Sequence, residues 1–166
     1  MPVQYRIAAE IVDIRSDKPR RDEKFYIDTN VWFWMTYTRA GSSALFYQLL
    51  DYPGYVDSVL ENQGHVYQSP LAFPELAHLI ERAELNIYNK KNRSSKPVNG
   101  KEFRHNCPQA RKNVLKEIEA AWVQVKSLGE PLDTTLGNAF IDSALSRMTG
   151  PKVDGYDMFI LKLMTD

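Results

Sequence analysis

Three acidic side chains stand where short apolar segments of the sequence end or begin. Asp28 comes directly after the apolar run 25–27, with Asn30 two residues later. Glu75 follows a second apolar run at 65–68 and lies in the first turns of an expected helix, and Asp157 opens an apolar helix near the end of the chain. In an open α/β sheet, ligands bind at the carboxyl ends of the strands. Acids at such positions are therefore candidates for handling a metal ion or a phosphate.

Each acid taken singly also has a simpler structural explanation. Asp28 or Thr29 can cap the helix that follows, a role worth about 1 kcal/mol. Glu75 and Asp157 can complement the positive end of their helices, with Asp154 as the cap of the last one. The residues alone leave both explanations open.

The order of these motifs resembles that of the PIN domain, the metal-dependent ribonuclease fold of VapC-type toxins and RNA-processing nucleases. The resemblance covers residues 24–166. It rests on Asp28-Thr29-Asn30 after a strand, on Glu75 in a Pro-Glu-Leu helix start and on Asp157 before an apolar helix. It implies that Asp28, Glu75 and Asp157 bind Mg²⁺ or Mn²⁺, and that Asn30 helps to orient the site.

Carboxylates suit this chemistry because Mg²⁺ and Mn²⁺ prefer carboxylate and water oxygens. Such an ion orients a phosphodiester, activates a water and stabilises the charge that develops. The resemblance therefore implies an endoribonuclease that acts on RNA. For a small single domain it further implies the toxin of a toxin–antitoxin pair, with a cognate antitoxin and a homodimer.

The sequence departs from the family pattern near its end. A PIN domain continues past its last apolar helix into a strand that carries a further Asp, whereas this sequence stops at Asp166 without them. A truncated chain, a partner that completes the sheet and a catalytically degenerate RNA- or protein-binding relative are all compatible with that ending. A metal-dependent DNA nuclease is a third function that the acids alone do not exclude.

The composition predicts one globular domain. The chain has 166 residues, of which 43% are hydrophobic and 25% charged, as in ordinary globular proteins. No run approaches the ~20 apolar residues of a membrane span, and the first residues lack the apolar core of a secretory signal. The single cysteine, Cys107, excludes an internal disulfide. We expect a cytoplasmic protein that contacts no membrane.

Basic residues gather at 88–107, although the formal net charge of the chain is zero. The segment is rich in Asn, Ser, Pro and Gly, which predicts an exposed loop. Such a loop can contact phosphates, and it can equally be a solvated surface without a partner. The predicted RNA-binding residues are Lys90, Lys91, Arg93, Lys96, Lys101 and Arg104.

The alternation of apolar runs and helical patterns predicts a three-layer α/β/α sandwich around a mainly parallel sheet. Residues 1–23 are expected to form an arm or linker, in which 5–14 reads as a strand or a short helix. Strands are expected at 25–27, 65–68 and 130–133, and helices at 31–37, 42–61, 74–87, 108–128, 138–148 and after Asp157. The aromatic cluster 32–35 predicts core, and the second helix, with Leu45, Phe46, Leu49 and Leu50 on one face, is expected to break near Pro53.

Overall fold

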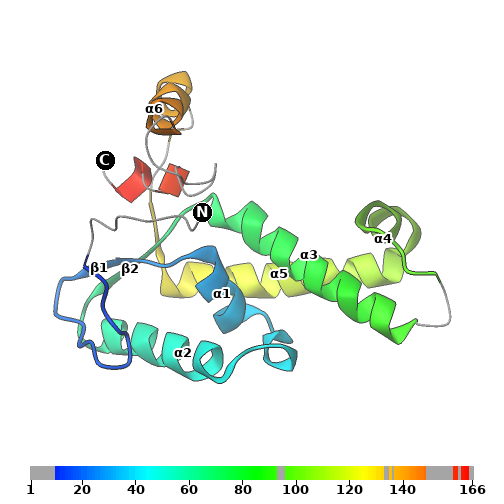
Figure 1. The fold of residues 1–166 in the computed structure, drawn as a ribbon, viewed down its shortest axis with the longest axis horizontal. Coiled ribbons are helices and arrows are strands. Elements are labelled where there is room, and N and C mark those ends of the chain that lie inside the picture. Colours follow the sequence, from blue (N-terminus) through cyan, green and yellow to red (C-terminus); the bar gives the residue numbers. More distant parts are fainter. Residues whose placement is uncertain are drawn as a thin grey trace, which may run out of the picture.

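The computed structural model describes residues 10–92, 96–132, 135, 137–148, 159–160 and 162–164. This part of the chain forms a mixed α/β fold that is mostly helical and contains three parallel strands (Figure 1). In chain order the elements are β1 (Lys24–Tyr26), α1 (Thr29–Thr36), the short 3-10 helix η1 (Ala40–Ser42), α2 (Phe46–Glu61), β2 (His65–Gln68), α3 (Ala72–Lys91), α4 (Gly100–Asn106), α5 (Pro108–Leu128), β3 (Glu130–Pro131) and α6 (Asn138–Met148). The α/β class and the parallel sheet that the sequence predicts are confirmed.

The sheet has the strand order β1-β2-β3, and both pairs of neighbouring strands are parallel. Lys24 pairs with His65 and Tyr26 pairs with Tyr67, which in turn pairs with Glu130. Because successive side chains of a strand alternate between the two faces, these five residues share one face of the sheet. We call it the tyrosine face.

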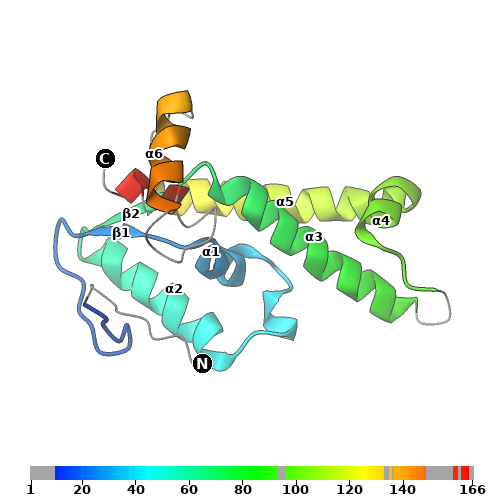
Figure 2. The same ribbon diagram turned by 45° about the horizontal axis from the view of Figure 1, so that its top comes forward.

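The core lies on the opposite face, where Val66 is 2% exposed. Helix α1 packs against α2, α3 and α5, and α3 packs along α5 (Figure 1). Helix α6 projects away from these helices in both ribbon views (Figure 2). The helical residues of the core include Trp32, Phe33, Val56, Val59, Leu76, Ile80, Phe103, Val114, Ile118, Ala121 and Val125. The predicted core role of the aromatic cluster is thus confirmed for Trp32 and Phe33.

Helix α2 runs unbroken through Pro53, so the predicted break is wrong. A proline removes one internal hydrogen bond of a helix. Tertiary packing holds the turns that follow it, because Val56 and Val59 are 2% and 0% exposed. The start of α2 faces outward instead of into the core, with Leu45 58% and Phe46 80% exposed.

Helix α2 ends at Glu61, the last residue of the expected helix 42–61. The Gly64 N–H donates to the Val59 carbonyl at 2.9 Å and the Gln63 N–H donates to the Leu60 carbonyl at 3.0 Å, the two bonds of a Schellman cap. Gln63 has φ 60°, in the left-handed region that favours glycine. The cap turns the chain directly into β2.

The predicted basic loop is largely helical, which corrects the sequence interpretation. Lys90 and Lys91 form the last turn of α3, and Lys101 and Arg104 lie in α4. Helix α4 forms because Asn99 and Glu102 make a capping box, each side chain accepting from the other residue's N–H at 3.0 Å. From its sequence neighbours alone, Asn99 is typical of a loop as well as of a helix cap.

A buried polar network links α1 to α3. Glu84 is 6% exposed and accepts a hydrogen bond from the Tyr37 hydroxyl at 2.6 Å. Its second carboxylate oxygen accepts from Arg39 Nη1 at 2.9 Å. Both oxygens are therefore bonded, as a buried carboxylate requires.

Residues 10–23 contain turns but neither a helix nor a strand, and residues 1–9 of the expected arm lie outside the described residues. The arm is tied to α2 by a hydrogen bond that the Tyr55 hydroxyl donates to Asp17. Within the described ranges, no helix is both long and apolar enough to cross a membrane.

Candidate active site

Asp28 lies immediately beyond the end of β1 and caps α1. Its Oδ1 accepts a hydrogen bond from the Asn30 backbone N–H at 2.8 Å, so the predicted capping role is confirmed. The side chain is exposed, and no partner for Oδ2 occurs among the described residues. Capping therefore uses one carboxylate oxygen of Asp28 and leaves Oδ2 without a partner among the described residues.

The charge of Asp28 also affects a tyrosine on α2. Burial raises the pKa of Tyr52, and the neighbouring Tyr47 and the negative charge of Asp28 raise it further.

Glu75 lies in the first turn of α3 and is half-buried. Among the described residues, no hydrogen-bond donor or cation contacts its carboxylate. Because β1 and β2 are parallel neighbours, the segments that follow them leave from the same edge of the sheet. The helices that carry Asp28 and Glu75 also pack against each other. The fold thus brings two of the predicted acids to one edge.

The third predicted acid, Asp157, lies outside the described residues. Asn30 is exposed in the first turn of α1, and its contact with Asp28 is made by its backbone N–H. Within the described part of the chain, no group of three or more His, Cys, Asp or Glu side chains is placed to hold a metal ion. Asp28 and Glu75 are therefore the two predicted metal ligands whose positions the structure describes.

Three buried polar groups near this edge were not singled out from the sequence. Thr29 Oγ1, Trp32 Nε1 and Gln68 Oε1 have no hydrogen-bond partner in the part of the chain that the structure describes, although the three residues are 1%, 0% and 3% exposed. Trp32 and Gln68 meet across Gly129, where a Cβ would lie 3.3 Å from Trp32 Cζ2 and 3.2 Å from Gln68 Cγ. The end of β2 and the start of α1 therefore carry buried polar groups as well as the exposed Asp28. The sequence pattern gave little indication of these buried polar groups, because Thr29 is typical of a helix cap and Trp32 of a core residue.

Two of the predicted RNA-binding residues, Lys90 and Lys91, lie at the opposite end of α3 from Glu75. Glu75 and Lys91 are sixteen positions apart on α3, a separation of about 24 Å at a rise of 1.5 Å per residue. Lys90, Lys91, Lys96 and Lys101 are exposed, and none forms an ion pair within the described ranges. Arg104 differs, because it pairs with Glu81 together with Arg111. Arg93 lies outside the described residues.

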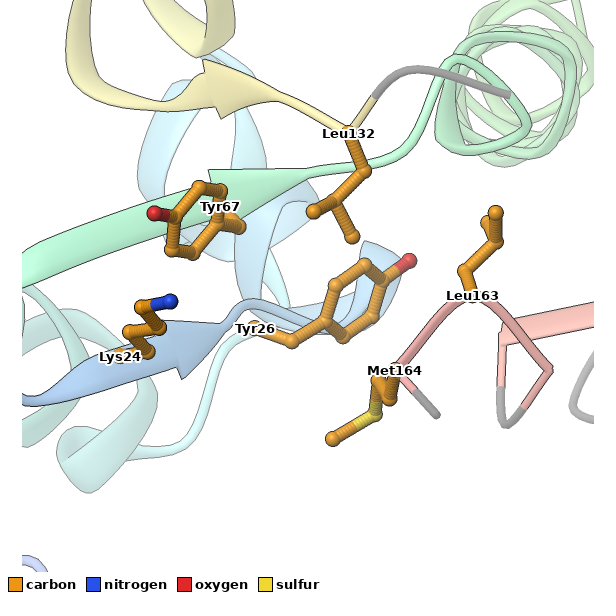
Figure 3. A pocket seen from close by; sticks show the side chains of 6 residues that line it. All are labelled: Lys24, Tyr26, Tyr67, Leu132, Leu163 and Met164. Carbon is orange, nitrogen blue, oxygen red and sulfur yellow. The ribbon is translucent and has the colours of Figure 1, made fainter. Parts of the chain in front are cut away.

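A pocket of about 310 Å³ lies on the tyrosine face of the sheet, next to the same edge (Figure 3). Tyr26, two residues before Asp28, extends its phenol beyond the end of β1, and the ring of Tyr67 extends the other way along β2. Leu163 and Met164 face Tyr26 from the opposite side. These two residues and Leu132 are the described side chains that cover this part of the face.

No protein-family model, curated protein or solved structure matches this chain. The class of the protein is therefore defined by its fold alone, a mixed α/β domain with a small parallel sheet.

Proposed function

We propose that this protein is a Mg²⁺- or Mn²⁺-dependent endoribonuclease of the PIN type. The observation that carries the proposal is the parallel pairing of β1 and β2, which sends Asp28 and Glu75 to one edge of the sheet. The order of the motifs in the sequence supports it independently. In this proposal Asp157 completes the ligand set and Asn30 orients the site.

The donor chemistry of the two acids fits a hard divalent cation. Mg²⁺ is commonly held by one or two carboxylates and keeps several waters. Asp28 offers Oδ2, while its Oδ1 bond to the Asn30 N–H fixes the orientation of the carboxylate. Glu75 offers a carboxylate without a competing partner among the described residues. When bound, the ion would activate a water for attack on the phosphodiester and stabilise the developing charge.

We further propose that the fold is a three-layer α/β/α sandwich. In this arrangement the C-terminal helical residues 159–160 and 162–164 cover the tyrosine face of the sheet. We also include a cytoplasmic toxin that acts as a homodimer and is blocked by a cognate antitoxin. Both parts rest on the resemblance of the sequence motifs.

Cleavage of a labelled single-stranded RNA with Mn²⁺ or Mg²⁺ tests the proposal. We expect Asp28→Asn and Glu75→Gln to lower the cleavage rate roughly 10²-fold or more, since each removes a ligand whose ion supplies several kcal/mol. The matched control is Asp57→Asn, which removes an exposed acid on α2 and should leave the rate unchanged. Calorimetry with Mn²⁺ should show binding that is lost in Asp28→Asn. A folded wild type that binds no Mn²⁺ would refute the proposal.

The exposed lysines favour a second function, a catalytically degenerate RNA-binding module. Lys90 and Lys91 can contact phosphates without any contribution from Glu75, since Lys91 lies about 24 Å further along α3, and Lys101 is likewise exposed on α4. RNA binding without metal-dependent cleavage in the wild type would establish this alternative.

A further inference from the structure

The pocket on the tyrosine face is lined by aromatic and apolar side chains and by Lys24, and none of the proposed metal ligands is among its lining residues. Tyr26 and Tyr67 are directly opposite each other on neighbouring strands, and both are half-buried. Aliphatic side chains of Leu132, Leu163 and Met164 complete the walls (Figure 3). An apolar pocket with a few polar groups, of about 310 Å³, has the size and character of a small-ligand site.

One face of the Tyr67 ring contacts another side chain of the same strand. The imidazole of His65 stacks on it, with the ring centroids 6.2 Å apart and an interplanar angle of 24°. His65 in turn shares a hydrogen bond of 3.0 Å with Glu130 on the third strand. A planar ligand therefore meets an aromatic ring whose orientation is supported by contacts within β2 and between β2 and β3.

Lys24 adds a positive charge at the margin of the same pocket. Its side chain is exposed and has no ion-pair partner within the described residues. A flat aromatic group with an attached anion satisfies both features, the rings and the ammonium group. A base in single-stranded nucleic acid is such a group, because every base has a π-face and carries a phosphate beside it.

We propose that this pocket binds one unpaired nucleobase of the RNA, with the base against Tyr67 and the neighbouring phosphate against Lys24. The inference rests on the proposed function in taking RNA as the substrate. It deepens that function by assigning a nucleotide contact on the face of the sheet whose strand β1 ends just before Asp28, and Tyr26, which lines the same pocket, is two residues before that acid.

Binding of a fluorescent single-stranded RNA in EDTA tests the pocket without cleavage. Loss of one aromatic–base stack is expected to weaken binding roughly 5- to 150-fold, so Tyr67→Leu should raise Kd by that factor. Tyr67→Phe keeps the ring and should bind like the wild type. Tyr47→Leu is the matched control, because Tyr47 is a 43% exposed tyrosine on α2, outside the pocket. Equal losses in Tyr47→Leu and Tyr67→Leu would overturn the proposal.

Two further measurements do not depend on how well Tyr67→Leu folds. In the first, a single abasic residue is placed at successive positions of the RNA. At one position it should weaken binding to the wild type as much as Tyr67→Leu weakens binding of the intact RNA. Combining that abasic RNA with Tyr67→Leu should raise Kd no further than either change alone. Lys24→Gln should reduce the log–log salt dependence of Kd by about 0.7, the share of one phosphate contact on a single strand, while Lys116→Gln on α5 should not. An abasic scan without any such position would overturn the proposal.

The pocket and the nuclease can fail separately. Binding that depends on Tyr67, combined with no cleavage in Mn²⁺, would support the pocket and refute the nuclease. Cleavage that is lost in Asp28→Asn but indifferent to Tyr67 would do the reverse. A free mononucleotide that binds more tightly than the RNA would show that the pocket serves a small metabolite, and would overturn the assignment to RNA.

Discussion

Replacing Tyr37 with phenylalanine should destabilise the protein by an amount that depends on pH in a defined direction. The Tyr37 hydroxyl donates to Glu84 at 2.6 Å in a site where both residues are buried, at 4% and 6% exposure. A hydrogen bond to a charged group contributes about 1.5–3 kcal/mol. Because Arg39 still bonds the other oxygen of Glu84 in the variant, we expect the lower part of that range, about 2 kcal/mol at pH 7.

The pH dependence follows from the raised pKa of Tyr37. Burial is the largest cause, and the hydrogen bond to Glu84 adds to it, so the folded-state pKa lies above the ordinary value of 10.0. Below pH 10 the full contribution of the phenol is present. Above pH 10 the unfolded chain loses a proton that the folded chain keeps, and the contribution is lost. The difference between wild type and Tyr37→Phe should therefore shrink by up to about 1.4 kcal/mol per pH unit above 10.

Urea unfolding of both proteins at pH 7 and at two values above pH 10 measures this difference. Tyr55 also has a raised pKa, from burial and its bond to Asp17, but it is present in both proteins and cancels. A double-mutant cycle with Glu84→Gln should give a coupling of about 1–2 kcal/mol. A Tyr37→Phe variant within 0.5 kcal/mol of the wild type at pH 7, or a difference that grows at high pH, would refute the reasoning.

Three further changes test the backbone and the packing near the site. Gln63→Gly should stabilise the protein by about 0.5–1 kcal/mol in urea unfolding, since φ 60° strains a non-glycine residue; a less stable variant would contradict the Schellman geometry. Gly129→Ala should cost about 1–3 kcal/mol, because its Cβ would press on Gln68 at 3.2 Å; unchanged thermal unfolding would disprove this contact. Gly54→Ala, inside α2 with nothing within 4 Å, should instead raise stability by about 0.5–1 kcal/mol, and a loss there would indicate that α2 is broken at Pro53 after all.

Local patterns predicted the elements that tertiary packing then supports. The bounds of β2, α5 and α6 match the expected ranges 65–68, 108–128 and 138–148, because apolar period and end signals agree there. The break predicted at Pro53 does not occur, because the preference of proline against helix is a local effect. The burial of Val56 and Val59 against other elements stabilises the helix beyond it. The apolar face of Phe46 was expected from its spacing, but spacing cannot reveal that this face points to solvent.

The candidate site was predicted in part, and the limits have physical causes. Strand ends and parallel pairing are enough to bring Asp28 and Glu75 to one edge. The distance of Lys91 from Glu75 depends on the length of α3, because the two residues lie near its two ends. The helix expected at 74–87 is shorter than α3, so the sequence did not predict this distance. The pocket beside Tyr67 depends on the register of β1 against β2, and a one-residue slip would turn that ring to the other face.

Asp28 is the residue at which the capping and metal-binding interpretations meet, and one substitution separates them. Asparagine caps a helix about as well as aspartate, because its side-chain oxygen can accept the same N–H bond from Asn30. Asp28→Asn should therefore leave the free energy of unfolding unchanged within a few tenths of a kcal/mol and still abolish Mn²⁺ binding. Asp28→Ala removes the cap as well and should cost about 1 kcal/mol. If Asp28 only caps α1, Asp28→Asn changes neither quantity, and an unchanged Mn²⁺ isotherm would remove this acid from the ligand set.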